Sequence, residues 1–154
     1  MHQKLSKQSG VGLIEVLVAV LVLSIAFLGI AALQAMSLST NNSAMARSMA
    51  TIASYSILDA MRADSANVTA YNTASSITAN NCPAAAGSLA NAQLNTWCKQ
   101  LAQSLGASAS TTGNINCTVV ATSVTDCTVT ITFDDSRAGV GGSAIQTITT
   151  KAML

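Results

Sequence analysis

The feature that most constrains this chain is an apolar stretch near the N-terminus, Val11–Ala35, in which Glu15 is the only charged residue. At about 1.5 Å per residue, a helix over Val11–Met36 measures about 39 Å, enough to cross roughly 30 Å of hydrocarbon with tilt. Lys4 and Lys7 precede the stretch, so the positive-inside rule predicts a cytoplasmic N-terminal side. We therefore expect a single-pass membrane helix, with the remainder of the chain outside the inner face of the membrane.

Glu15 is the unusual residue of this stretch. A carboxylate within a bilayer costs on the order of 2.5–3.5 kcal/mol, and the rest of the apolar helix holds no cation to balance it. A cut after Gly10 would create an amine on Val11, four residues before Glu15 and therefore on the same helix face. The same pair could form between neighbouring helices. Glu15 thus fits a processed and assembled chain better than a plain membrane anchor, which is the alternative.

The residues around Glu15 carry a resemblance to a known family. Gly10–Leu17 reads GVGLIEVL and resembles the class III signal of type IV pilins and type II secretion pseudopilins. The resemblance implies that a membrane-embedded aspartyl prepilin peptidase cuts between Gly10 and Val11 and methylates the new amine of Val11. It also implies that Glu15 sets the register of each subunit against its neighbour. Val11 replaces the family's usual Phe or Met and Gly12 its usual Thr, but the Gly–Glu spacing is intact.

The chain divides into four expected segments. The small-residue junction Ser9-Gly10 lies before the apolar stretch, whereas a secretory signal carries such a junction after its apolar core. We therefore expect a cleaved prepilin leader at 1–10, a transmembrane and assembly helix at 11–35, an amphipathic stalk helix at 36–64 and an extracytoplasmic head at 65–154.

The stalk and the head have periodic patterns. The stalk helix is predicted to end near Ala63, with its head-facing side formed by Met45, Met49, Ile52, Ala53 and Ala60. Ile57 lies at the edge of this face, and Leu58 and Met61 lie elsewhere, which leaves a second covered face open. In the head we expect a loop at 66–87, a helix at 88–105 capped by Gly106, strands at 116–121, 126–133 and 144–152, and a turn-rich loop at 134–142. One face of the helix is formed by Leu94, Trp97, Leu101 and Leu105. In the strand 126–133 apolar residues alternate with threonines, and in the last strand Ile145, Thr147 and Thr149 face opposite to Gln146, Ile148 and Thr150. The predicted fold class is α+β: a long N-terminal helix packed against a small antiparallel sheet with one extra helix, as in type IV pilins.

Four cysteines lie in the predicted head: Cys82, Cys98, Cys117 and Cys127. They form no CxxC pair and have no accompanying histidine, so the pattern favours disulfides over a zinc site. Three pairings are open. We favour Cys117 with Cys127 across a hairpin whose loop is 121–123, and Cys82 with Cys98, each closure contributing about 3 kcal/mol in the chain-entropy model.

Catalysis and nucleic-acid binding receive little support. The only histidine, His2, lies in the predicted leader, so the mature chain has no imidazole, and no nucleophile motif is present. We expect neither an enzyme nor a cofactor or metal. Asp134 and Asp135 would be a weak calcium site, and a solvated turn is the favoured interpretation.

The cations that follow the leader are scattered rather than clustered, which argues against a nucleic-acid surface: Arg47, Arg62, Lys99, Arg137 and Lys151.

A finer resemblance concerns the role of the subunit. The segment 25–34 and the helix bearing Trp97 resemble the type IV pilus modification protein (PilV) group of minor pilins. This resemblance implies a minor pilin that helps start pilus assembly. Its partners would be prepilin peptidase, other minor and major pilins, the inner-membrane assembly platform and the membrane. It would sit in the inner membrane with a periplasmic head before assembly, and in the pilus at the cell surface afterwards. The alternatives are a minor pseudopilin of type II secretion and a membrane-tethered binding protein that never polymerises.

Overall fold

The computed structural model describes residues 10, 12–122, 124–136 and 145–154. The chain divides into two compact units, Met1–Leu38 and Ser39–Leu154. Helix α1, Leu13–Ala63, contributes its first half to the first unit and its second half to the second. It ends at Ala63, where the sequence predicted an end, because the polar run Asp64–Asn67 follows.

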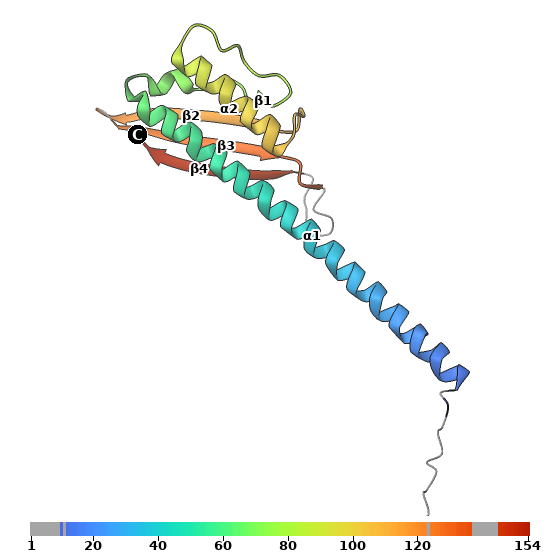
Figure 1. Ribbon diagram of the computed structural model, residues 1–154. Helices are drawn as coiled ribbons and strands as arrows, with labels where there is room; N and C mark the ends of the chain where they lie inside the picture. The colour runs from blue at the N-terminus through green and yellow to red at the C-terminus, as the bar shows by residue number, and fades with distance from the viewer. Residues whose placement is uncertain (1–9, 11, 123, 137–144) are drawn as a thin grey trace, which may run out of the picture. The chain divides into compact units, whose positions relative to one another are not determined.

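The second unit contains a short 3-10 helix η1 (Ser65–Tyr71), a helix α2 (Leu89–Leu105) and the strands β1 (Ile77–Thr78), β2 (Thr112–Ala121), β3 (Val124–Phe133) and β4 (Gln146–Met153). Among the described residues the strands form one antiparallel sheet in the order β1-β2-β3-β4. Helix α2 and the C-terminal half of α1 both lie over one face of this sheet (Figure 1). The predicted α+β fold class, with a long N-terminal helix packed against a small antiparallel sheet, is therefore confirmed.

The predicted alternation in β3 and β4 is confirmed. Side chains at every second position of β3 are buried, and the intervening threonines are only partly covered. In β4 the more exposed positions are Thr147 and Thr149, opposite in facing to Gln146, Ile148 and Thr150, and Ile145 just before the strand is exposed as well. The core-facing residues of β2 and β3 are Ile115, Cys117, Cys127, Val129, Ile131 and Phe133. One face of the sheet is thus buried beneath the helices, as a half-covered antiparallel sheet requires.

Helix α2 joins the sheet to α1. Ser88 caps its N-terminus by accepting a hydrogen bond from the Asn91 backbone N–H at 3.1 Å. The residues Leu94, Trp97 and Leu101, predicted to share one face, are buried. The indole Nε1–H of Trp97 donates to the carbonyl oxygen of Ala53 in α1 at 2.9 Å, so α2 is fixed to α1 as well as packed against β2.

The predicted head-facing side of α1 is wrong for two of its members. Met45 and Ile52 are 59% and 54% exposed, and the buried stripe instead consists of Ala50, Ala53, Ser54, Ile57, Leu58 and Met61. Small residues dominate the part of this stripe that faces Trp97, because the ring and its hydrogen bond to Ala53 need a close approach of the two helices. Of the predicted side, Ala53 is buried and Met49 and Ala60 are partly buried. The burial of Leu58 and Met61 shows that a second face of α1 is covered as well.

The predicted loop at 66–87 contains two elements of its own, η1 and β1. Side chains rather than an apolar pattern hold this segment against the edge of β2. The Asn72 carboxamide accepts from the Cys117 backbone N–H at 2.6 Å and donates to the Cys117 carbonyl at 3.0 Å. The Thr73 backbone N–H donates to the Ile115 carbonyl at 3.0 Å. Asn72 and Thr73 therefore pair with the same edge of β2 as β1 does, further along that strand.

The two hairpin strands are longer than predicted. β2 begins at Thr112 rather than Asn116, and pairing with β3 reaches Ala121 opposite Val124. Cys117 and Cys127 are direct cross-strand partners, and their Cα atoms lie 4.0 Å apart in a disulfide. The second disulfide joins Cys82 to Cys98, with Cα atoms 5.6 Å apart. This is the pairing that the sequence favoured, and it ties the segment before α2 to the middle of that helix.

Replacing both Cys82 and Cys98 by Ser should lower the free energy of unfolding of the head by about 3 kcal/mol, because the bond spans a sequence separation of 16 residues. The chain contains a single tryptophan, the buried Trp97, so its fluorescence follows unfolding of the head in urea. Reductant should destabilise the double variant further, because the disulfide Cys117–Cys127 is still present and can be reduced. A urea unfolding midpoint of the double variant equal to that of the wild type would contradict the expected loss of stability.

A buried tyrosine closes the turn after α1. Tyr71 is fully buried, and its hydroxyl donates to the Asp64 carboxylate at 3.3 Å. Asp64 also accepts from the Asn67 side chain at 2.7 Å, so its carboxylate fixes η1. Burial raises the pKa of Tyr71 above its ordinary value of 10.0, and the negative charge and hydrogen bond of Asp64 raise it further. The folded head therefore retains the phenolic proton to higher pH than the unfolded chain.

This shift predicts a loss of stability at alkaline pH. Below pH about 10 both states are protonated at Tyr71, and above it the unfolded state loses the proton first. The free energy of unfolding should therefore fall as pH rises from about 10 towards the folded-state pKa. In Tyr71→Phe the fall between pH 9 and 11 should be shallower, measured by urea midpoints from Trp97 fluorescence. Tyr55→Phe, at a residue 53% exposed, is the matched control and should keep the wild-type slope.

Candidate functional site

The first turn of α1 holds the residues that the sequence singled out. The Gly12 carbonyl accepts hydrogen bonds from the backbone N–H groups of Glu15 at 2.9 Å and of Val16 at 3.3 Å. Gly12 thus begins the helix, and Glu15 lies in its first turn. A carboxylate there interacts favourably with the positive end of the helix dipole. The dipole offsets part of the cost of placing an acid in an apolar segment.

The surface around Glu15 is almost wholly apolar. All side chains from Leu13 to Leu38 are exposed, including Leu28 at 72% and Phe27 at 61%. Within the described residues α1 is the one helix long and apolar enough to cross a membrane, and Leu13–Met36 measures about 36 Å at 1.5 Å per residue. Such a surface is unstable in water and requires either lipid or other helices around it.

Of the two residues at the predicted cleavage site, the structure describes Gly10 and not Val11. Gly10 is described and exposed, and a Cβ built on it would meet no atom within 4 Å. Val11, the expected first mature and methylated residue, lies outside the described residues, as does 1–9 of the expected leader. The helix begins at Leu13, so a Val11 amine facing Glu15 one turn away requires the helix to extend N-terminally after cleavage. Cleavage, methylation and the ion pair remain predictions.

Of the two carboxylates after β3, Asp134 fits the solvated turn that the sequence favoured and Asp135 does not. Asp134 is exposed, and its Oδ1 accepts from the Ser136 backbone N–H at 2.8 Å. Asp135 is 5% exposed, and its Oδ2 accepts from the hydroxyl of Ser43 in α1. Across the described ranges no group of three or more His, Cys, Asp or Glu side chains is placed to hold a metal ion. The two acids instead form part of the wall of a cavity.

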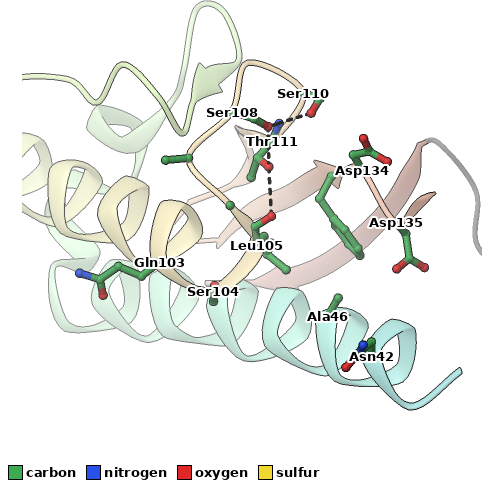
Figure 2. Close-up of a pocket in the computed structure, with 13 residues that line it drawn as sticks. Asn42, Ala46, Gln103, Ser104, Leu105, Ser108, Ser110, Thr111, Asp134 and Asp135 are labelled. Carbon is green, nitrogen blue, oxygen red and sulfur yellow. Dashed lines mark hydrogen bonds between the residues drawn. The ribbon is translucent and has the colours of Figure 1, made fainter. Parts of the chain in front are cut away.

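This cavity was not predicted from the sequence. It has a volume of about 580 Å³ and lies in the second unit, between α1, the C-terminal end of α2, the loop before β2 and the end of β3 (Figure 2). Its polar lining residues come from segments far apart in the chain, and only the fold brings them together. Adjacent serines and threonines at 108–111 were the available signal, but a chain this rich in Ser and Thr does not distinguish them.

Comparisons with known proteins bear on the N-terminal segment. Residues 5–31 match the family model of the prokaryotic N-terminal methylation motif, a stretch that contains Gly10, Val11 and Glu15. No curated protein and no solved structure matches the chain. The motif and the exposed apolar half of α1 together indicate membrane anchoring, and the motif implies interaction with other pilins and the pilus machinery. Proteins of the pilin-like structural family that carries this motif are generally not enzymes. The methylation motif, at the start of a long apolar helix, indicates a type IV pilin or pseudopilin-like protein.

Proposed function

We propose that this chain is a minor type IV pilin, a structural subunit that helps to initiate pilus assembly after cleavage between Gly10 and Val11. The observation that carries the proposal is the position of Glu15, in the first turn of a helix whose first half is apolar and exposed. Prepilin peptidase would remove 1–10 and methylate Val11. Other minor and major pilins and the inner-membrane assembly platform would be the partners of the mature subunit.

The energetics of Glu15 support assembly rather than simple anchoring. A carboxylate in hydrocarbon costs on the order of 2.5–3.5 kcal/mol, and no Lys or Arg occurs in the apolar half of α1. The amine created at Val11 would supply the missing positive charge, either within the chain or from an adjacent subunit. Because apolar helices in lipid gain little from hydrophobic contact alone, such a polar contact can set their mutual register.

A minor-pilin role is favoured by the resemblance of segment 25–34, and of the Trp97 helix followed by a short sheet, to the PilV group. A minor pseudopilin of type II secretion is the second candidate, since it shares the N-terminal motif. In either case the subunit would sit in the inner membrane with its head in the periplasm. For a pilin it would then move to the pilus at the cell surface.

Deletion of the gene, followed by complementation, tests the proposal. The deletion strain should lose surface pili and twitching while exoprotein secretion stays normal, and the wild-type gene should restore both. Complementation with Glu15→Leu should yield a cleaved chain that does not restore pili, whereas Ile14→Leu, its neighbour on the exposed apolar surface, should restore them. Normal pili with defective secretion would refute the pilus role in favour of the pseudopilin.

A further inference from the structure

The two edges of the sheet in the head differ in how they are covered. On the β2 side, β1 pairs with the start of the strand, and Asn72 and Thr73 bond to the backbone of Ile115 and Cys117. The opposite edge is β4. Within the described part of the chain, β3 is the only hydrogen-bonded neighbour of β4.

The register shows which backbone groups of β4 point away from the sheet. Thr125 and Leu154 exchange both backbone hydrogen bonds, at 2.8 and 2.9 Å. Because bonded and non-bonded pairs alternate along an antiparallel ladder, the even-numbered residues of β4 bond to β3. The odd-numbered residues direct their N–H and C=O groups outward, and their side chains are exposed as well: Thr147, Thr149, Lys151 and Met153.

This outer edge of β4 is suited to pairing. The strand has 8 residues, contains no proline and pairs with β3 without a register shift. Natural sheets protect an exposed edge with short strands, prolines, bulges or charges, and of these devices β4 has a single lysine, Lys151. A row of outward backbone groups on an extended strand is complementary to one kind of partner, which is another extended strand.

A second copy of this chain is a poor source of that strand. Its β2 edge is already occupied by β1, Asn72 and Thr73. Antiparallel pairing of β4 with the β4 of a second copy would relate the two by a two-fold axis perpendicular to the sheet. That axis reverses the direction of α1, which packs along the sheet face. Chains anchored in one membrane by the same N-terminal segment point in the same direction, so the fitting partner is a different chain.

We propose that the outer edge of β4 binds an extended strand of a different pilin-like subunit, antiparallel to β4 and with an acidic side chain beside Lys151. The backbone groups of the odd-numbered residues supply the hydrogen bonds. Lys151, the only charged residue of β4, selects the partner, because opposite charges on neighbouring strands stabilise pairing and like charges oppose it. The inference rests on the proposed role in assembly, and not on the choice between a pilus and a secretion system.

Photo-crosslinking in cells tests the proposal on the full-length chain. With p-benzoylphenylalanine in place of Thr147, irradiation should join the chain to another protein that carries the N-terminal methylation motif. Mass spectrometry of the product should place the crosslinked residue in an extended strand of that protein. The same probe in place of Asn116 is the control, because Asn116 is exposed on the same sheet face but lies in β2, two strands away from β4. It should give little product.

Matched variants at Thr149 separate backbone pairing from side-chain contact. Thr149→Pro removes one outward N–H and leaves the bonds to β3, so it should lower the yield from the probe at 147 about tenfold. Thr149→Val keeps the N–H and should give the unsubstituted yield. Lys151→Glu should lower the yield about threefold without touching the backbone. Urea midpoints from Trp97 fluorescence show that each variant is folded.

Four results would overturn the proposal: no product from the probe at 147, an equal yield from the probe at 116, a second copy of this chain as the partner, or a wild-type yield from both Thr149→Pro and Lys151→Glu. Absence of the product in a chain that restores assembly contradicts this inference alone. Normal pili and normal secretion in the deletion strain contradict the proposed function instead.

Discussion

A Gly10→Glu chain should remain at precursor size and stay out of filaments. The expected aspartyl peptidase would have to bind a carboxylate next to the scissile bond, close to its own catalytic acids, where like charges repel. Loss of only 1.4 kcal/mol of transition-state stabilisation slows cleavage about tenfold, and a misplaced charge costs more. Without the cut, Val11 has no free amine, so Glu15 loses its proposed partner.

The structure makes this substitution a clean test. A Cβ at Gly10 would meet no atom within 4 Å, and Gly10 precedes α1, so we expect the fold of the head to be unchanged and the effect to lie in recognition by the peptidase. Intact mass spectrometry of the purified chain gives the outcome, namely retention of 1–10 and absence of a methyl group. Gly12→Thr, which introduces the residue more usual in the family, is the control and should still be cleaved. Maturation of Gly10→Glu to wild-type size would disprove the assigned cleavage site.

The sequence predicted those parts of the fold in which side-chain chemistry repeats along the chain. The C-terminal ends of α1 and α2 and the alternation of β3 follow from local periodicity and from residues that end a helix, such as Gly106. The beginning of β2 did not, because Gly113 and Asn114 are poor strand formers by propensity. Their strand conformation comes from pairing with Ile131 and Thr130 of β3, which no local pattern records.

Which residues of the head are buried could not be predicted from the sequence, because burial there depends on contacts between distant segments. Ala50 and Ser54 in α1 are fully buried, although neither is strongly apolar, because α2 approaches α1 closely there. The cavity was missed for the same reason, since Asn42, Thr111 and Asp135 meet only after the sheet forms. At the N-terminus, by contrast, the roles proposed for Gly10 and Glu15 depend on their spacing along the chain, so the sequence alone indicated that part of the candidate site.

Gly113→Ala should destabilise the head by about 3 kcal/mol, the upper end of the usual cost of overpacking a core. A Cβ at this position in β2 would lie 2.7 Å from Cζ3 of Trp97 and 3.0 Å from Cδ1 of Leu101, and closer still to Cη2 of Trp97. Trp97 cannot easily withdraw, because its indole N–H is bound to the Ala53 carbonyl. The gain of up to about 1 kcal/mol from restricting the unfolded chain is too small to compensate.

Pulse proteolysis in urea measures this loss without relying on the tryptophan itself. Trp97→Phe in the Gly113→Ala background removes the ring atoms that clash, so the double variant should be more stable than the sum of the two single losses predicts. Gly29→Ala is the matched control, since its Cβ would meet nothing within 4 Å and it lies in the other unit. A Gly113→Ala head as stable as the wild type would mean that α2 does not lie against β2 as closely as described. The attachment of α2 to both α1 and the sheet would then have to be revised.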